Sequence, residues 1–381
     1  MKILYCAIDQ AVPGTKGGSV HVTAVAEGLA ALGHEVHALV TPGGPFPAGA
    51  VHWTAMAPPF GAKELRWART GAVKALARRL RPDVVIERYY NFGGEGIAAA
   101  REVGATGVLE VNAPVIDHAG SKKALIDHLL IVQPMRRWRE RMCRDSDLIV
   151  TPTAGILPRR TPSSKVVTLE WGADTGRFHP GARGPLPFTR PQGTLAVFAG
   201  AFRSWHGAIH LANAIKALRA RGRHDINALF IGDGPQLSRV RAAADGIDGI
   251  VLTGAVPHDR MPACLAAADI GVAPFDLEQH AALALGFYWS PLKIFEYMAS
   301  GLPVVAPRVA RIPSLVTHER EGWLYDPSEP GALAAALERL SDPGLRRTLG
   351  DAARARAVGE YSWQAHCEAL DAAIRRVRGE S

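Results

Sequence analysis

The chain has 381 residues, 48% of them hydrophobic and 21% charged, which is the composition of a globular protein with room for two domains. No apolar run approaches the ~18 residues of a membrane-spanning helix, and the opening run 2–8 is too short for a signal peptide, so we expect a cytoplasmic protein. The four cysteines are widely spaced, which argues against a zinc site or a disulfide framework.

The 44 basic and 36 acidic residues leave a formal net charge of +8. Much of the excess lies in two segments of helical period, 63–82 and 136–144. Such segments form solvated helix faces, or they bind anionic lipid, nucleic acid or phosphorylated ligands. No nucleic-acid-binding motif accompanies them, so we expect no nucleic acid partner. A solvated helix face and peripheral contact with the inner face of a membrane both remain open.

Short apolar runs alternate with helical runs along the whole chain. In the first half we expect strands at 2–8, 35–40, 83–88, 107–112, 147–151 and 165–169. In the second half we expect them at 194–200, 227–232, 250–254, 270–275, 303–307 and 322–326. The runs are continuously apolar, as strands buried on both faces should be, and the intervening helices predict parallel sheets with right-handed crossovers.

The pattern restarts after a segment rich in Pro and Gly, 178–193, which we interpret as a linker between two Rossmann-like domains. We therefore expect a first domain at 1–182, a second at 183–360 and a final helix at 361–381. Open parallel sheets bind ligands beyond the carboxyl ends of their strands, so a cleft between two such domains is the expected site.

Three loops carry candidate chemistry, and the first follows the first strand in "PGTKGGSVHV". Gly17 and Gly18 would let the backbone approach a ligand, and the helix that follows would offer free N–H groups to a phosphate. The spacing is neither that of a dinucleotide fingerprint nor that of a P-loop. A plain flexible turn is the alternative.

The second loop follows the strand that ends at Gly200, in "FAGAFRSWHG". Arg203 and His206 lie in it, where a cation would face a diphosphate and stabilise its departure. The alternative for Arg203 is an ordinary surface salt bridge.

The third segment reads "SPLKIFEYMASGLPVVA". Ser290 suits a helix N-cap and Pro291 the first helical position, so the free N–H groups of Leu292 and Lys293 would form an anion site with the lysine charge beside it. Glu296 would repel phosphate, but it can accept two hydrogen bonds from a vicinal diol such as a ribose. The alternative is a simple Lys293–Glu296 pair on the helix.

Asp145 and Asp147 have the Asp-x-Asp spacing that holds a divalent metal in some sugar-transferring enzymes. They lie between a basic helix and a strand, and Asp147 is better interpreted as a strand-entry residue. No other carboxylate or His cluster suggests a metal, so we expect none.

Together these motifs resemble a GT-B glycosyltransferase, most similar to family 4 of the retaining nucleotide-sugar-dependent enzymes. The resemblance covers nearly the whole chain and rests on "GTKGGSVHV", "EWGADTGRFHP", "FAGAFRSWHG", "FIGDGPQLSRV", "VLTGAVPHDRMPACLAAADIGVAPF" and "SPLKIFEYMASGLPVVA". It implies an α/β fold of two Rossmann-like domains facing across a cleft, with the final helix crossing back to the first domain. It also implies a nucleotide-diphosphate sugar as co-substrate, UDP favoured over GDP or TDP, with no cofactor and no metal.

The same resemblance assigns the donor to the second domain and the acceptor, whether a small molecule, a glycan or a lipid-linked group, to the first. Glu296 matches the Glu that holds the nucleotide ribose, and Val256 a position where backbone meets the nucleobase. The expected donor-binding set is Gly17, Gly18, Gly200, His206, Val256, Tyr288, Ser290, Pro291, Leu292 and Glu296.

Four positions depart from the family pattern. Tyr288 stands where a Glu eight residues before Glu296 often contacts the donor sugar. Asn112 stands where a His often lies near the reacting carbon, and Ala201 and His206 stand where Arg and Lys are usual in the diphosphate loop. These departures leave a non-catalytic nucleotide-sugar-binding protein open as an alternative. A nucleotide-sugar epimerase is a second alternative, although its usual set of carboxylates and His is not seen.

A retaining transfer needs stabilisation of the leaving group more than a protein base. We expect Arg203, Lys293 and the start of the third segment's helix to stabilise the departing diphosphate, and Asn112 to orient the sugar or the acceptor. The acceptor-side candidates are Glu87, Arg88 and Glu110. Their alternative is an ordinary salt bridge.

Overall fold

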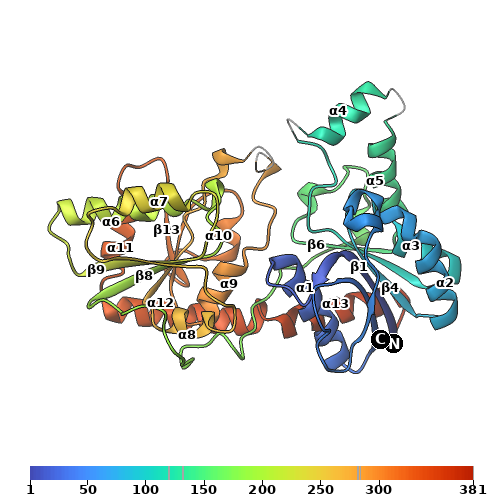
Figure 1. The fold of residues 1–381 in the computed structure, drawn as a ribbon, viewed down its shortest axis with the longest axis horizontal. Helices are drawn as coiled ribbons and strands as arrows, with labels where there is room; N and C mark the ends of the chain where they lie inside the picture. The colour runs from blue at the N-terminus through green and yellow to red at the C-terminus, as the bar shows by residue number, and fades with distance from the viewer. Residues whose placement is uncertain (119–120, 131–132, 281–282, 284, 381) are drawn as a thin grey trace. The chain divides into compact units, whose positions relative to one another are not determined.

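The computed structural model describes residues 1–381 except 119–120, 131–132, 281–282, 284 and 381 (Figure 1). The chain forms two compact units, the first made of Met1–Trp171, Tyr288–Ser290 and Trp363–Ser381, the second of Gly172–Phe287 and Pro291–Ser362. The first unit thus ends earlier than the expected position 182. The reason is that Ala173 N donates to Tyr361 O and Arg354 donates to Thr175 O and Phe178 O, which ties the start of the linker to the second unit.

The first unit has one sheet of parallel strands in the order β3-β2-β1-β4-β5-β6-β7. The strands are β1 (Lys2–Val12), β2 (Glu35–Pro42), β3 (His52–Ala55), β4 (Val84–Arg88), β5 (Thr106–Glu110), β6 (Leu148–Thr151) and β7 (Val166–Thr168). Its helices are α1 (Gly17–Ala31), α2 (Thr70–Leu80), α3 (Glu95–Val103), α4 (Lys122–Leu129), α5 (Pro134–Asp145) and α13 (Trp363–Arg378).

Both faces of this sheet are covered, which explains why its strands read as continuous apolar runs. Val25 of α1 and Leu370 of α13 share one buried cluster with β1 and β2. Val73 of α2 and Ala99 of α3 share another on the opposite face. The sequence did not predict β3, because its side chains are mostly exposed and form no apolar run.

The second unit has a parallel sheet in the order β10-β9-β8-β11-β12-β13. The strands are β8 (Thr194–Ala199), β9 (Ile226–Ile231), β10 (Ile250–Gly254), β11 (Ile270–Val272), β12 (Val304–Pro307) and β13 (Gly322–Tyr325). The helices are α6 (Ala208–Ala220), α7 (Leu237–Ala244), α8 (Met261–Ala266), α9 (Leu292–Ala299), α10 (Ile312–Leu315), α11 (Ala332–Arg339) and α12 (Pro343–Glu360). The predicted α/β fold of two Rossmann-like parallel-sheet units is confirmed.

Short 3-10 turns complete the chain: η1 (Pro59–Gly61), η2 (Lys63–Arg69), η3 (Ala154–Ile156), η4 (Ser163–Lys165), η5 (Ser204–His206) and η6 (Leu277–Gln279). In the described part of the chain, no helix combines the length and the apolar composition needed to cross a bilayer.

Candidate active site

The predicted phosphate-binding segment forms α9, which begins at Leu292 after Pro291. The N–H groups of Leu292 and Lys293 meet no acceptor among the described residues, as expected at a helix start. The predicted N-cap is wrong. No side chain caps α9, Pro291 precedes its first residue, and Ser290 belongs to the first unit.

Ser290 is committed elsewhere, which explains why it does not cap the helix. Its hydroxyl donates to Glu170 Oε2 (2.7 Å) and accepts from the Trp171 backbone N–H (3.0 Å). The hydroxyl therefore holds the end of the first unit's main segment rather than a free helix terminus.

Lys293 carries a buried ammonium group for which the described residues provide no hydrogen-bond partner. Its Nζ lies 4.2 Å from the ring centroid of Phe198 and 5.4 Å from that of Phe275. Burial lowers the pKa of Lys293 to about 7, although the nearby Glu296 carboxylate opposes this shift. The alternative, a Lys293–Glu296 ion pair, does not form within the described residues. A buried cation without an anion is a costly arrangement that an anionic ligand would relieve.

Gly200, directly after β8, gives Lys293 the room it occupies. Gly200 has φ +131°, and a Cβ there would lie 3.3 Å from Lys293 Nζ. Gly207 has φ +67°, and a Cβ there would overlap Pro274 O. Both glycines are therefore required by backbone conformation and by close approach.

Arg203 and His206 lie in the loop between these glycines. The Arg203 guanidinium stacks on Trp205, 5.4 Å from the ring centroid, and has no carboxylate partner among the described residues. Burial lowers the pKa of His206 to about 3, and the charges of Lys293 and Arg203 add to this shift. His206 Nδ1 lies 2.5 Å from Ala201 O, so this nitrogen carries the proton of a neutral ring. The cationic side chains of this loop region are thus Arg203 and the protonated form of Lys293, whereas His206 is neutral at pH 7.

Glu296 lies one turn after Lys293 on α9 and is partly exposed. Its Oε1 is 3.8 Å from His258 Nε2, in the loop that follows β10. Val256 lies in the same loop, and its backbone groups make no hydrogen bond among the described residues. The Glu296 carboxylate on α9 thus lies close to the loop after β10, which carries the backbone groups of Val256. The sequence reasoning missed His258, although it stands in the quoted "GAVPHDRM" motif.

Tyr288 is buried and groups with the first unit, in contact with Trp289 at 4.8 Å between ring centroids. Burial raises the pKa of its phenol to about 12, so it is neutral near pH 7. It does not replace the charge of the Glu that the family often carries at this position.

In the first unit, Glu110 at the end of β5 is saturated by other side chains. Its Oε1 lies 2.6 Å from His21 Nε2 and accepts from Asn112 Nδ2 (3.0 Å), while Oε2 accepts from Tyr5 Oη–H (2.6 Å). Burial alone would raise the pKa of Glu110, but His21, Arg88 and Tyr5 together hold it well below its usual range. Glu110 thus holds this cluster of side chains together. Its contacts fit the alternative of an ordinary salt bridge better than they fit a role in acceptor binding.

Arg88 is less completely paired than Glu110. Its Nη1 lies 3.4 Å from His21 Nδ1 and 3.9 Å from Glu110 Oε1, and its guanidinium stacks on Trp171 at 5.7 Å. A Cβ on Gly18 would lie 3.4 Å from Arg88 Nη2, so Arg88 borders the glycine loop. His21, which the sequence reasoning missed, is the link between these residues.

Asn112 follows β5 and is half-buried. Its Oδ1 accepts from Trp171 Nε1 (2.8 Å) and its Nδ2 donates to Glu110. One Nδ2 hydrogen and one Oδ1 lone pair remain for a ligand.

Glu87 is fully buried and is not placed to bind an acceptor. Its carboxylate accepts from the backbone N–H groups of Gly94 (2.5 Å) and Ile97 (2.8 Å), at the start of α3, and lies 3.6 Å from Arg66. The prediction of an acceptor contact at Glu87 is therefore wrong, because all of these partners are part of the protein.

The Asp-x-Asp pair serves structural contacts. Asp145 pairs with Arg101 (2.7 Å) and Arg144 (3.1 Å), and Asp147 accepts from Gly107 N (2.8 Å) at the start of the strand. Within the described ranges, no group of three or more His, Cys, Asp or Glu side chains is arranged to hold a metal ion.

Two family models match the chain. Residues 15–159 match Glycosyltransferase Family 4, and residues 193–342 match Glycosyl transferases group 1. The two matches lie in different units and together cover most of the chain.

Curated relatives include sulfoquinovosyl transferase SQD2 of Arabidopsis thaliana, 27% identical over 62% of this chain and 46% of the relative. The MMP alpha-(1->4)-mannosyltransferase of Mycolicibacterium hassiacum is 32% identical over 51% of this chain and 44% of the relative. In these matches the chain spans about half the length of the relatives. Alpha-D-kanosaminyltransferase of Streptomyces kanamyceticus is 25% identical over 82% of this chain and 83% of the relative.

Solved structures share the fold over the whole length. Sucrose-phosphate synthase of Thermosynechococcus elongatus aligns with a TM-score of 0.74 at 18% identity, covering 100% of both chains. The Anabaena protein Alr3699/HepE, solved in complex with UDP-glucose, aligns with a TM-score of 0.68 at 16% identity, covering 99% of this chain and 100% of that one.

Proposed function

Because the chain belongs to the GT-B glycosyltransferases, built from a family 4 and a group 1 domain, we propose that it moves a sugar from a nucleotide-diphosphate sugar to an acceptor hydroxyl, with retention and without a metal. The observation that carries the proposal is the pair of cations, Lys293 and Arg203, beside the glycine-containing loop after β8. Neither has an anionic partner among the described residues, and Lys293 Nζ is buried.

The donor diphosphate would bind at the start of α9. The free N–H groups of Leu292 and Lys293 and the positive end of the helix dipole favour a phosphate there, and the Lys293 ammonium adds a full charge. Arg203 supplies a second charge from the loop after β8. These groups stabilise the negative charge that grows on the diphosphate as the bond to the sugar breaks.

The nucleoside would bind between Glu296 and the loop after β10. The Glu296 carboxylate accepts hydrogen bonds from the two ribose hydroxyls, and the backbone of Val256 pairs with the base. UDP is the first base to test, because the Anabaena neighbour was solved with UDP and with UDP-glucose.

Retention follows if the leaving phosphate oxygen takes the acceptor proton on the face from which it departs. This route needs no protein base, in keeping with the lack of a His at position 112. On the acceptor side, Arg88 and Asn112 keep unused hydrogen-bonding capacity, whereas Glu87 and Glu110 hold the scaffold. We also propose peripheral contact with a membrane surface through a basic segment of the first unit.

Thermal-shift titration with UDP, GDP, TDP, ADP and CDP, without added metal, tests the donor site. One diphosphate should raise the melting temperature, since a ligand at about a hundred times its Kd adds about 2.7 kcal/mol to folded-state stability. Lys293→Met should lose this shift and the exposed-lysine control Lys216→Met should keep it. Wild-type protein that responds to none of the five diphosphates would contradict the proposed donor site.

A further inference from the structure

Helix α4 of the first unit turns a polar residue inward. Asp127 is buried, and its carboxylate accepts from the backbone N–H groups of Met135 and Arg136 (2.8 Å each). It thereby satisfies the first turn of α5, and it also lies 3.4 Å from Arg139 Nη2. The Asp127 carboxylate thus attaches α4 to α5.

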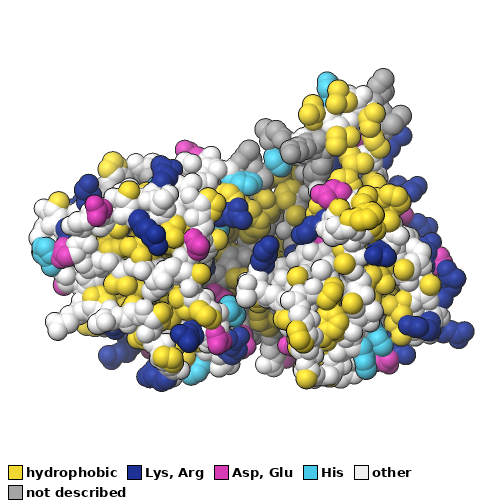
Figure 2. All heavy atoms as spheres, viewed as in Figure 1, with side chains coloured by type: hydrophobic (Ala, Val, Ile, Leu, Met, Phe, Trp, Pro, Cys, Tyr) yellow, Lys and Arg dark blue, Asp and Glu magenta, His cyan; other side chains and the backbone are white. Residues whose placement is uncertain are grey.

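The opposite side of α4 carries large apolar side chains. Leu125 is 60% exposed and Leu129, one turn later, is 71% exposed, while Ile126 and Leu130 are 39% and 49% exposed. Leu125 and Leu129 are four residues apart and therefore share one face of the helix, and Leu130 follows directly after its last residue. Figure 2 shows hydrophobic side chains gathered on the segment that Figure 1 labels α4. A surface helix of a globular protein normally has the reverse pattern.

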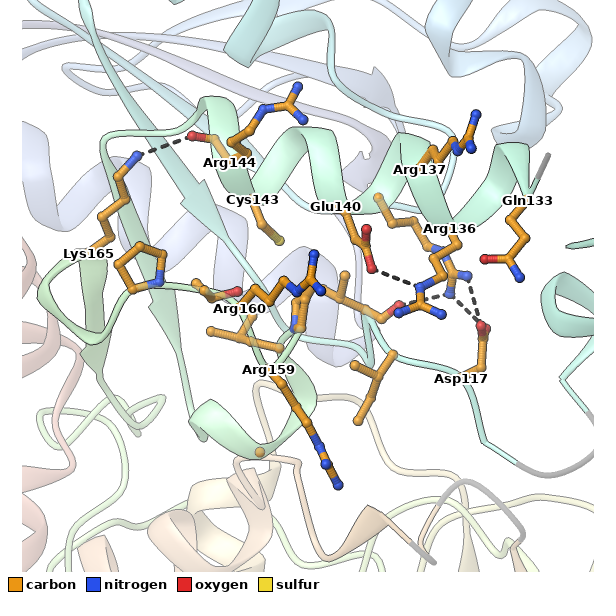
Figure 3. Close-up of a pocket in the computed structure, with 18 residues that line it drawn as sticks. Asp117, Gln133, Arg136, Arg137, Glu140, Cys143, Arg144, Arg159, Arg160 and Lys165 are labelled. Carbon is orange, nitrogen blue, oxygen red and sulfur yellow. Dashed lines mark hydrogen bonds and ion pairs between the residues drawn. The ribbon is translucent and has the colours of Figure 1, made fainter.

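A basic cavity lies beside α5 (Figure 3), and one of its lining residues, Arg139, is the arginine that Asp127 of α4 contacts. The cavity has a volume of about 1140 Å³ and is bounded by α5 and by the segment 155–165. Seven of its eighteen lining residues are Arg or Lys and two are Asp or Glu. Both carboxylates are already neutralised, Asp117 by Arg139 (2.8 Å) and Glu140 by Arg136 (2.8 Å).

The side chains of three further arginines of the cavity lining have no hydrogen-bond or ionic partner among the described residues: Arg137, Arg159 and Arg160. In Figure 3, Arg160 extends into the cavity toward α5, Arg159 points away from α5, and Arg137 projects from the far side of α5. Their charges are therefore available to an anionic surface.

The other basic segment of the sequence, 63–82, is neutralised in part within the protein. Arg66 is fully buried among Asp9, Glu87 and Glu95. Lys74 and Arg78 both pair with Glu102 (2.8 Å each).

We propose that α4 and the arginines of the adjacent cavity form a docking surface for an anionic phospholipid bilayer. The exposed leucines and Ile126 of α4 enter the interfacial layer, and the lipid phosphates contact Arg159 and Arg160. A bilayer surface offers an acyl-chain boundary to the apolar side chains of α4 and a layer of phosphates to the arginines. A soluble phosphate ester would contact the arginines alone. This inference deepens the membrane contact proposed above and rests on it.

Vesicle co-sedimentation of the full chain tests the docking surface. The protein should bind vesicles of phosphatidylglycerol mixed with phosphatidylcholine, bind pure phosphatidylcholine far less, and lose affinity as salt is raised. Leu125→Ser with Leu129→Ser, and separately Arg159→Gln with Arg160→Gln, should each weaken binding roughly tenfold. The matched controls, Val358→Ser with Val377→Ser and Arg79→Gln with Arg81→Gln, should bind as the wild type does.

Three outcomes would overturn the inference. The first is no binding to anionic vesicles at low salt, and the second is equal weakening by the control pairs. The third is insensitivity to the leucine pair together with full competition by soluble glycerol phosphate, which would make the cavity a site for a soluble anion. Concentration-dependent self-association that the leucine pair abolishes, without vesicle binding, would instead assign α4 to a second copy of the chain. Diphosphate thermal shifts measured on the same variants keep a failed donor site distinguishable from a failed docking surface.

Discussion

Lys293 should take up a proton when a nucleoside diphosphate binds. Its pKa of about 7 in the free protein means that at pH 8 about nine-tenths of the molecules carry a neutral lysine. A bound diphosphate places an anion beside Nζ and raises the pKa again, so binding at pH 8 should draw nearly one proton from the buffer.

The same coupling sets the pH dependence of affinity. Below the free-protein pKa, Lys293 is already charged and binding costs no proton. Above it, each pH unit should weaken binding by up to about 1.4 kcal/mol, or tenfold, until the pKa of the bound state is reached. At pH 8 the terminal phosphate is itself deprotonated, since its second pKa is about 6, so it does not obscure the uptake.

Isothermal titration calorimetry in buffers of different ionisation enthalpy measures this proton directly. Wild type and the control Lys216→Met should show uptake near one at pH 8 and a smaller value at pH 6. Lys293→Met should show no uptake and a nearly flat affinity between these pH values. Proton uptake that persists in Lys293→Met, or a wild type that binds without uptake, would refute the assignment of Lys293 to the diphosphate.

The remaining predictions concern stability and the two half-sites. Because folding lowers the pKa of Lys293, the unfolded chain binds more protons than the folded chain between about pH 7 and 10.5. The free energy of unfolding of wild type, relative to that of Lys293→Met, should therefore rise with pH across this window, as urea titrations would measure. Glu296→Gln should weaken nucleoside diphosphate binding by about 1.5–3 kcal/mol, and the loss should shrink with a deoxyribose analogue; an equal loss with both sugars would remove Glu296 from the ribose. Glu87→Ala should destabilise the fold by about 2–5 kcal/mol, because two N–H groups at the start of α3 lose their acceptor, while the KM for the acceptor stays unchanged in folded protein; a raised KM would return Glu87 to the acceptor site.

The sequence identified the elements whose signals are local. Apolar runs such as 194–200 and 227–232 mark strands buried on both faces, because that burial favours apolar residues along the whole strand. The order of motifs, from the glycine loop to the α9 segment, was enough to indicate the fold and the family. β3 escaped because an exposed edge strand needs no such run.

The roles of the charged residues were decided by the tertiary structure, because their partners lie far away in the chain. Glu87 resembles a ligand-binding carboxylate in the sequence, but it is consumed by α3 and by Arg66, and Glu110 by His21 and Tyr5. Ser290 has the right position for an N-cap, yet Glu170 takes its hydroxyl. No local pattern reports such pairings.

The sequence by itself thus determined which segments become buried strands and helices, since hydrophobic periodicity acts over a few residues. Only the tertiary structure decided which charges are satisfied and which remain available, since that depends on what the fold brings beside each of them. Among the residues that the structure describes, Lys293 has no anionic partner, Arg66 is enclosed by three carboxylates, and α4 turns Asp127 inward and its leucines outward. These differences in burial and pairing distinguish residues that the sequence alone presents as equivalent.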